Sequence, residues 1–212
     1  MRKLLICPFF GALPSWWDEY EAQLPHLEEI GYDILLDFDL DRFKQRVTDK
    51  LDVDCPITLG SPKIHDYRAA FGVLYADEAS GYEWYGTTDF DCVYGRIDRF
   101  VTPEKLDRCA IYSDCQYQYI SGPFSLYRNE PRVNELFSHH EHWVEILEIT
   151  RATGWVETDF SEIARNEVEV LIENNHGFGN PNALHRASDG TLTLRGEEIS
   201  HFHFNRTKEW PL

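Results

Sequence analysis

The alternation of strands and helices near the N-terminus most constrains how this chain can fold. An apolar run from Lys3 to Phe10, interrupted by Pro8, predicts a buried strand, and a second strand is predicted at 32–36. Residues 40–51 have the apolar spacing of an amphipathic helix. With a helix expected between the two strands, this order is typical of a parallel α/β sheet, whose ligands bind outside the carboxyl ends of its strands.

Capping residues and prolines mark the other predicted helices. Ser15 is expected to cap the helix between the first two strands, with Pro25 near its end. Ser61 is expected to cap a helix that starts at Pro62 and extends to Tyr75. Two more helices are predicted, one beginning within 131–137 and one over 159–172 with Asp159 as its N-cap.

The second half of the chain contains short strand signals and a hairpin signal. Strands are predicted at 108–112, within 121–129 and at 199–204. Asp189-Gly190 lies between two apolar segments and predicts a β-hairpin. We therefore expect an α/β fold with a mixed, mainly parallel sheet flanked by helices and with a C-terminal β-hairpin extension.

Composition excludes several classes of protein. The chain has 212 residues, enough for one large domain, and its formal net charge is −17 from 37 acidic and 20 basic residues. Such a surface repels phosphate backbones, so general nucleic-acid binding is not expected. No apolar run approaches the ~20 residues of a membrane span. Five scattered cysteines without a Cys-x-x-Cys motif indicate free thiols in a reducing cytoplasm, which is the expected location.

The stretch from Tyr82 to Gly95 carries the strongest candidate chemistry. It reads as an aromatic and β-branched strand that ends in Asp89 and Asp91 and is closed by a glycine. Because side chains alternate along a strand, both carboxylates should project to the same side. They repel each other unless a cation or a basic side chain lies between them. Hard oxygen ligands with open positions suit Mg²⁺ or Mn²⁺ that carries substrate phosphates.

Asp-x-Asp is a weak motif when taken alone. Only the pair at 89 and 91 follows an apolar strand and precedes a glycine. The alternative interpretation is an acidic strand end that caps the following turn, and the spacing does not decide between the two. The motif occurs four times, at 37/39, 39/41, 52/54 and 89/91.

Five segments carry a family resemblance: 6–11, 63–72, 85–95, 121–129 and 203–208. In this order they resemble a family of bacterial and viral glycosyltransferase-like proteins of the GT-A fold, many encoded near capsule or lipopolysaccharide genes. The helix with Asp66 and Arg68, which precedes the Asp-x-Asp, is more distantly similar to the sugar-nucleotide site of large clostridial toxin glucosyltransferases.

The resemblance implies one GT-A-like domain over 1–212. Its nucleotide-binding half would be 1–100, and its acceptor half, with a metal- and phosphate-binding tail, would be 101–212.

The resemblance also implies a metal site. Asp91 would bind the metal directly, Asp89 would hold the ribose or a metal-bound water, and His203 would be a further protein ligand. An imidazole ligand favours Mn²⁺ over Mg²⁺. His201 lies on the same face of the predicted strand, so the two histidines are not separated, and a core or edge-strand histidine is the alternative for His203. Lys208 would neutralise the leaving diphosphate, and the alternative is a solvated lysine of the tail.

Donor binding is assigned to residues near the N-terminus on the same resemblance. Asp66 and Arg68 would contact the ribose or the sugar hydroxyls, whereas the alternative is an ordinary ion pair such as Lys63 with Asp66. Family members often carry lysine at the position of Arg68, so the donor sugar is expected to differ. The nucleobase would be framed by Phe9, Phe10 and Gly11, with Asp37 accepting a hydrogen bond from it, although the two phenylalanines also fit a core.

For the acceptor side, the segment 159–162 resembles one that lies near such active sites. Asp159 is the candidate general base if the anomeric configuration inverts, whereas a retaining reaction needs no strong base. An ordinary helix N-cap with a capping-box Glu162 explains the same residues. The histidines at 139, 140 and 142 look like a metal cluster but are interpreted as a solvated polar turn.

The favoured hypothesis is a metal-dependent glycosyltransferase of polysaccharide biosynthesis. It would transfer a sugar from a nucleotide-diphosphate sugar, with a UDP-sugar favoured, to a hydroxyl acceptor such as a glycan. One alternative is a degenerate GT-A module that binds a nucleotide sugar or glycan without turnover. Another is a metal-dependent nucleotidyltransferase or phosphohydrolase, although no Gly-x-x-x-x-Gly-Lys phosphate loop is present.

Overall fold

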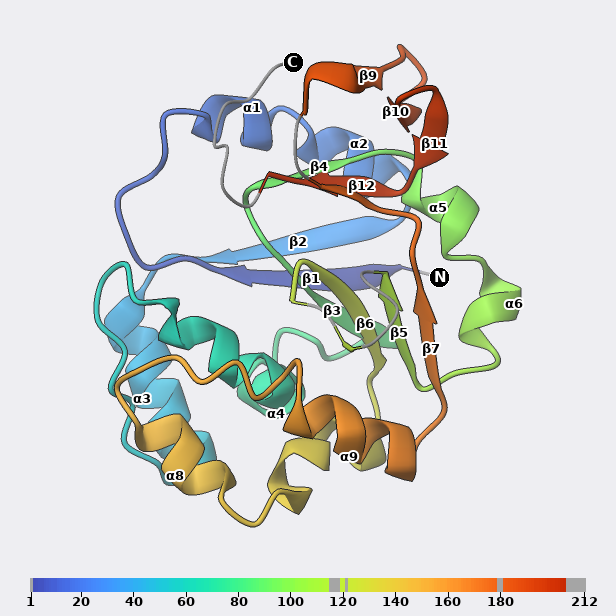
Figure 1. Cartoon of the computed structure of the whole chain (residues 1–212). Helices are drawn as coiled ribbons and strands as arrows, with labels where there is room; N and C mark the ends of the chain where they lie inside the picture. The colour runs from blue at the N-terminus through green and yellow to red at the C-terminus, as the bar shows by residue number, and fades with distance from the viewer. Residues whose placement is uncertain (1, 115–118, 121, 179–180, 205–212) are drawn as a thin grey trace.

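A six-stranded sheet lies at the centre of the computed structural model, which describes residues 2–114, 119–120, 122–178 and 181–204 (Figure 1). β6 runs antiparallel to both of its neighbours, and the other neighbouring strands of this sheet are parallel. This confirms the predicted α/β fold with a mixed, mainly parallel sheet. In spatial order the strands are β2 (Tyr32–Asp37), β1 (Lys3–Pro8), β3 (Trp84–Thr88), β6 (Phe124–Arg128), β5 (Ile111–Asp114) and β7 (Val170–Glu173).

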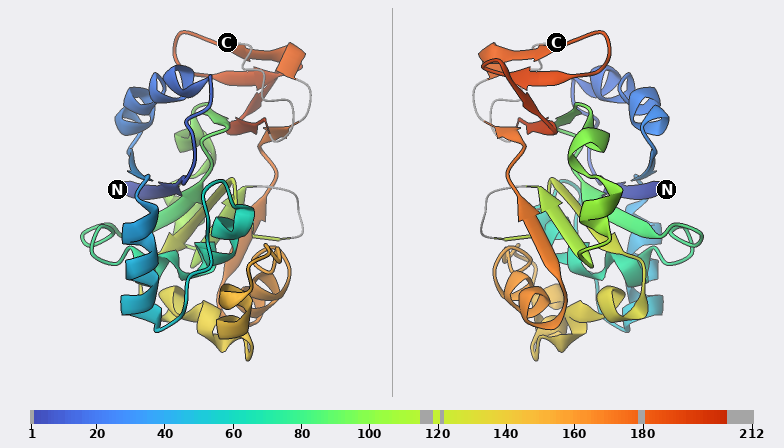
Figure 2. Two further views of the ribbon diagram at one scale, coloured as in Figure 1. Left: turned by 90° about the vertical axis from the view of Figure 1, so that its left-hand side faces the viewer. Right: turned by 90° about the vertical axis from the view of Figure 1, so that its right-hand side faces the viewer.

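Both faces of the sheet are covered, which explains why β1 is apolar along its length. Leu4 and Ile6 belong to one buried cluster, and the intervening Leu5 belongs to another on the opposite face. Helices α3 (Leu40–Leu51), α4 (Phe71–Leu74), α8 (Trp143–Glu148) and α9 (Asp159–Glu167) lie on the first face, and α1 (Trp17–Glu21) and α2 (Leu24–Glu29) on the second (Figures 1 and 2). The remaining short helices are η1 (Pro62–Ala70), α5 (Ile97–Phe100), α6 (Pro103–Leu106), α7 (Pro131–Asn134), η2 (Leu136–His139) and η3 (Pro181–Ala183).

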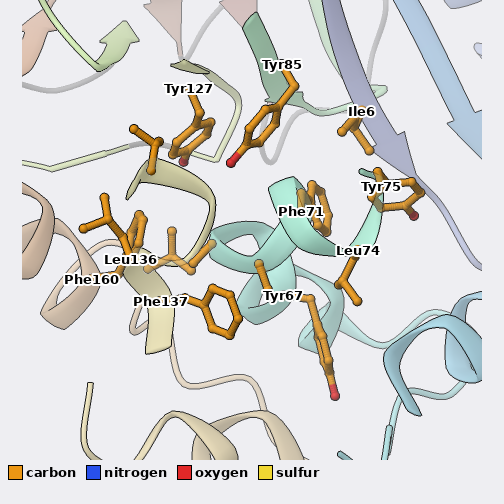
Figure 3. Close-up of a cluster of buried hydrophobic side chains, with 14 of the residues drawn as sticks. Ile6, Tyr67, Phe71, Leu74, Tyr75, Tyr85, Tyr127, Leu136, Phe137 and Phe160 are labelled. Atoms are coloured by element: carbon orange, nitrogen blue, oxygen red, sulfur yellow. The ribbon is translucent and has the colours of Figure 1, made fainter. Parts of the chain in front are cut away.

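The larger cluster is rich in aromatic side chains. Figure 3 shows Tyr85 and Tyr127 side by side, and their ring centroids are 5.3 Å apart and nearly parallel. Phe71 and Phe137 come from two different short helices and are drawn in the same cluster (Figure 3). Burying side chains of this size contributes a large part of the stability of short elements that would not persist alone.

The C-terminal part adds two small sheets. The predicted hairpin around Asp189-Gly190 is confirmed, because β9 and β10 pair antiparallel. A second hairpin, not predicted, turns through Arg195 and Gly196, both with positive φ. The first sheet contains β9 (Leu184–Arg186), β10 (Leu192–Leu194) and β11 (Glu197–Ile199), and the second contains β4 (Cys92–Tyr94), β12 (His201–His203) and β8 (Gly177–Phe178).

Several predicted boundaries were wrong for identifiable reasons. The helix expected from Ser15 is two helices, because Pro25 occupies the first turn of α2, where its missing N–H is tolerated. The helix expected over 159–172 ends at Glu167, and the apolar residues that follow form β7 at the edge of the sheet. The strand expected at 108–112 lies at Ile111–Asp114.

Membrane insertion receives no support from the helices. Among the residues described, no helix combines the length and the apolar character that crossing a bilayer requires.

A buried ion pair joins η1 to the loop between α8 and α9. Lys63 and Asp66 have side chains that are 0% and 1% exposed, and Lys63 Nζ lies 2.9 Å from Asp66 Oδ2. The same carboxylate accepts hydrogen bonds from the backbone N–H groups of Thr153 (2.9 Å) and Gly154 (3.1 Å). Lys63 Nζ also donates to the carbonyl oxygen of Ile146. We call these contacts the Lys63–Asp66 clasp.

Replacing one partner of this clasp should destabilise the fold strongly. Lys63→Met leaves the Asp66 carboxylate buried without its cation, and we expect a loss of about 3–5 kcal/mol in the free energy of unfolding. Urea denaturation measures it. The matched control is Lys50→Met, since Lys50 pairs with Asp77, whose side chain is 86% exposed. Its effect should be much smaller, because water screens an exposed ion pair. Equal effects of the two variants would contradict this interpretation.

Candidate functional site

A cavity of about 560 Å³ opens at the edge of the central sheet where β1 and β3 end. β6 is antiparallel and therefore begins at this same edge, so the residues that precede it also reach the cavity. This is the position at which open α/β sheets bind ligands. The lining comes from six segments: 7–10, 60–68, 89–91, 122–123, 152–157 and His203.

The two aspartates converge on one imidazole in this cavity. His203 Nε2 lies 3.3 Å from Asp91 Oδ1 and 3.9 Å from Asp89 Oδ2. The aspartates lie in the turn between β3 and β4, not on the strand itself, so the predicted convergence arises from the turn. β12 pairs antiparallel with β4 and places His203 opposite Cys92, next to Asp91 in sequence.

The structure separates the two histidines of β12. His201 is fully buried, its Nδ1 lies 3.0 Å from the Ser200 hydroxyl, and its ring stacks on that of His176. Burial lowers the pKa of His201 well below its usual value. For His203, burial lowers the pKa, but the hydrogen bond to Asp91 and the two carboxylate charges outweigh this, so its pKa is raised. His203 lines the cavity, and His201 does not.

The donor atoms of this cluster fit a hard divalent cation. Two ligand atoms of one Mg²⁺ or Mn²⁺ ion lie about 3–4 Å apart when each bond is about 2.1 Å, and the separations above fall in that range. Asp91, His203 and Cys92 place one possible ligand atom each within 4.8 Å of one another. Burial raises the pKa of the Cys92 thiol well above its usual value. Asp91 and His203 are the predicted ligands that belong to this cluster, and Asp89 lies 3.9 Å from the same imidazole nitrogen.

Arg68 reaches the aspartates from η1. Its Nη2 pairs with Asp89 Oδ1, and both side chains are largely buried. Burial raises the pKa of Asp89, but Arg68, His65 and His203 outweigh it, so the net shift is downward. Gly122 makes room for the guanidinium, because a Cβ at this position would lie 1.4 Å from Arg68 Nη1.

The 3-10 geometry of η1 explains which of its residues face the cavity. With three residues per turn, side chains three positions apart stack above one another. Pro62, His65 and Arg68 form one such row that lines the cavity, and Lys63 lies one turn from Asp66 in the clasp. Ile64 and Asp66 also reach the lining. An α-helix was expected here, and His65 was given no role although it lies in the matching segment 63–72.

His65 adds a neutral polar group to the cavity. The positive charge of Arg68, followed by burial, lowers the pKa of His65 to about 4. The imidazole is therefore uncharged at neutral pH and offers one donor and one acceptor.

Asp66 has a different position from the one expected of a donor ligand. It lies at the cavity wall, but its carboxylate accepts three hydrogen bonds within the clasp and is 1% exposed. The ion pair with Lys63, which was the alternative interpretation, is present, although it is buried and not at the surface. Asp66 thus holds a loop of the cavity wall.

Of the three residues expected to frame the nucleobase, Phe9 and Phe10 line the cavity and Gly11 does not. Phe9 lines the cavity and packs on Phe90, with ring centroids 4.2 Å apart. Phe10 reaches the lining but packs mainly in the core, where its ring lies 5.2 Å from that of Phe43. Gly11 is exposed and outside the lining.

Asp37, which was expected to accept a hydrogen bond from the nucleobase, does not line the cavity. It is fully buried outside the cavity and accepts hydrogen bonds from the Tyr75 hydroxyl (3.0 Å) and Arg42 (2.8 Å). These contacts tie the end of β2 to α3 and α4.

The acceptor-side prediction is also corrected. Asp159 lies outside the cavity lining, with a 55% exposed side chain 3.6 Å from His140 Nε2. It is the first residue of α9, whose N-cap position is Thr158 and has no side-chain cap. Glu157, which the sequence analysis missed, lines the cavity instead. Lys208 lies outside the described residues.

The Glu157 carboxylate is open to solvent at the cavity. The pKa of Glu157 is raised above its usual value, mainly because the cavity wall partly removes the carboxylate from water. The positive charges of Arg68 and His203 lower this pKa, and the negative charge of Asp89 raises it further. A carboxylate with a raised pKa is a stronger proton acceptor once ionised.

Removing the Arg68 charge should raise the pKa of Asp89. Because the ionised form of Asp89 is favoured in the folded protein, its contribution to stability is present above about pH 4 and is lost as pH falls through the folded-state pKa. In Arg68→Met this contribution disappears, and we expect about 1–3 kcal/mol lower unfolding free energy at pH 7. Carboxyl ¹³C NMR titration measures the pKa.

Gly122→Ala tests the same contact without deleting the charge. Its Cβ should displace the guanidinium and shift the Asp89 pKa in the same direction. Arg99→Met is the control, because Arg99 pairs with Asp189 and Glu198 away from the cavity. An unchanged Asp89 pKa in both cavity variants would refute the assigned pairing.

A comparison with solved structures identifies a protein of similar fold. The structure is similar to the crystal structure of a glycosyltransferase involved in the glycosylation of the major capsid of PBCV-1, with a TM-score of 0.58 and 10% sequence identity over 98% of this chain and 96% of that one. At this identity the likeness shows the fold alone. No curated protein matches the chain.

A family model of unknown function matches residues 33–186. This range contains η1, the aspartate pair and Glu157, whereas β1 and His203 lie outside it. The chain belongs to this family of unknown function, DUF6625.

Proposed function

We propose that this chain is a metal-dependent glycosyltransferase. It transfers a sugar from a nucleotide-diphosphate sugar, with a UDP-sugar favoured, to a hydroxyl acceptor such as a glycan. The observation that carries the proposal is the convergence of Asp89, Asp91 and His203, with Arg68 beside them, in a cavity at the carboxyl edge of the sheet. The glycosyltransferase fold of the solved neighbour supports the same class.

The charges of the cavity support a requirement for a cation. Within the part of the chain that the structure describes, the lining contains the carboxylates of Asp89, Asp91 and Glu157 and one guanidinium, that of Arg68. A bare diphosphate would be repelled by such a lining. Mn²⁺, or Mg²⁺, held by Asp89, Asp91 and His203 would supply the positive charge that offsets the charge growing on the departing diphosphate.

The chain's own residues orient the donor in this proposal. Arg68 holds the Asp89 carboxylate toward the cavity and leaves other guanidinium N–H groups for donor oxygens. Phe9 and Phe90 offer an apolar wall against which a nucleobase packs. His65 offers an uncharged hydrogen-bonding group for sugar hydroxyls, and Lys208 is proposed to bind the diphosphate.

A binding module without turnover is the second candidate. It is favoured by the absence from the cavity of the expected base, Asp159, and by the engagement of Asp66 within the clasp. Product analysis distinguishes these candidates, because a transferase releases free nucleoside diphosphate together with a glycosylated acceptor. A nucleotidyltransferase or phosphohydrolase would release pyrophosphate or free phosphate.

The first test is calorimetric binding of a panel of UDP- and GDP-sugars with and without Mn²⁺. We expect the wild-type protein to bind one of them only with Mn²⁺, and Asp91→Asn to weaken that binding by at least about 10-fold because a metal ligand is lost. Chelation with EDTA should have the same effect.

The control is Asp54→Asn, which alters the second aspartate of another Asp-x-Asp pair at an exposed position. Its donor affinity should equal that of the wild type. Absence of nucleotide-sugar binding by the wild type, or binding that ignores both Mn²⁺ and Asp91, would rule out the proposed site.

A further inference from the structure

We propose that Glu157 is the general base that takes the proton from the acceptor hydroxyl, so that the transferred sugar inverts its anomeric configuration. This inference rests on the proposed glycosyl transfer and extends it to the stereochemistry and the acceptor side. Glu157 lines the same cavity as Asp89, Asp91 and Arg68 but comes from the loop between α8 and α9.

The engagement of the other carboxylates singles out Glu157. Asp66 accepts three hydrogen bonds in the clasp, Asp89 pairs with Arg68, and Asp91 lies 3.3 Å from His203 Nε2. Within the described residues, no side chain or backbone group donates a hydrogen bond to the Glu157 carboxylate. It is also exposed, so an acceptor entering the cavity can reach it.

The loop that carries Glu157 is held firmly. Trp155 is 2% exposed, and its Nε1 donates a 2.8 Å hydrogen bond to the Asp66 carbonyl oxygen. The N–H groups of Thr153 and Gly154 are bound by the Asp66 carboxylate. Glu157 N donates to the carbonyl oxygen of Gly154 at 3.1 Å. These contacts hold the backbone that carries Glu157, so the loop does not have to be ordered when an acceptor binds.

The reaction step balances without another reactant. The acceptor oxygen attacks the anomeric carbon and forms the new glycosidic bond, while the bond from that carbon to the diphosphate oxygen breaks. The electron pair of the broken bond leaves with the nucleoside diphosphate. The acceptor proton passes to Glu157, which later returns it to solvent. A retaining reaction needs no strong base, so it would not require Glu157 to take a proton from the acceptor.

Glu157→Gln tests the proposal, because it keeps the size of the side chain and removes its basicity. The probes are commercial α-linked UDP-sugars with Mn²⁺, with water and methyl glycosides as acceptors, followed by ¹H NMR of the anomeric proton. We expect the β-anomer as the first product of the wild type. In Glu157→Gln the turnover should fall by about 10²–10⁴-fold, while the calorimetric affinity for the donor stays unchanged.

Asp159→Asn is the matched control, since it neutralises a carboxylate two residues away that lies outside the cavity. Its turnover should stay within about threefold of the wild type. A first product of α configuration, or wild-type turnover in Glu157→Gln, would overturn the role of Glu157 and leave the transferase assignment intact. A wild type that binds no nucleotide sugar would overturn both.

Discussion

The buried ion pair between Lys63 and Asp66 is the interaction on which the cavity depends. It lies within a short 3-10 helix and is bonded to the loop that precedes α9, so it joins two walls of the cavity that are nearly ninety residues apart in sequence. A charge pair that is fully removed from water is stable only when all of its hydrogen-bonding groups are engaged. The backbone N–H groups of Thr153 and Gly154 meet this condition, and the loop becomes fixed as a result.

A second long-range constraint is the pairing of β12 with β4. A three-residue strand near the C-terminus contributes little stability by itself, but its pairing register brings His203 beside the aspartates. Phe202, the residue between the two histidines, is buried in the cluster of the small C-terminal sheets. Side-chain alternation in β12 therefore directs the histidines to one face and uses Phe202 to anchor the strand on the other.

The sequence predicted the fold class and part of the site because both depend on local patterns. Apolar runs mark β1 and β2, and Leu40–Leu51 was predicted with its observed bounds from its apolar spacing alone. Asp89 and Asp91 were found because two carboxylates at the end of an apolar strand are chemically conspicuous, whereas Arg68 was singled out only by the family resemblance. Their roles as metal or donor ligands remain predictions.

What the sequence did not reveal depends on tertiary structure. Glu157 has the same local context as Asp159, and only the bonding of its loop to Asp66 decides which carboxylate faces the cavity. β7 was missed because Val170 and its neighbours continue the amphipathic pattern of the preceding helix. They form a strand because they pair with β5 at the edge of the sheet, a tertiary contact that the sequence pattern does not show. His65 was missed because α-helical and 3-10 spacing give different faces.

These constraints together explain how one cavity holds acidic groups with different tasks. Asp66 is neutralised by Lys63 and becomes part of the framework, whereas Asp89 is held by Arg68 and Asp91 by His203. Because carboxylates outnumber cations among the described residues of the lining, a diphosphate gains most when it enters together with a divalent cation. Glu157 has no such partner among the described residues, so its charge is free to act on a proton of the acceptor. The partner of each carboxylate therefore distinguishes its role. Asp66 belongs to the framework, Asp89 and Asp91 to the proposed cation site, and Glu157 is the proposed base. The Asp-x-Asp motif alone does not make this distinction.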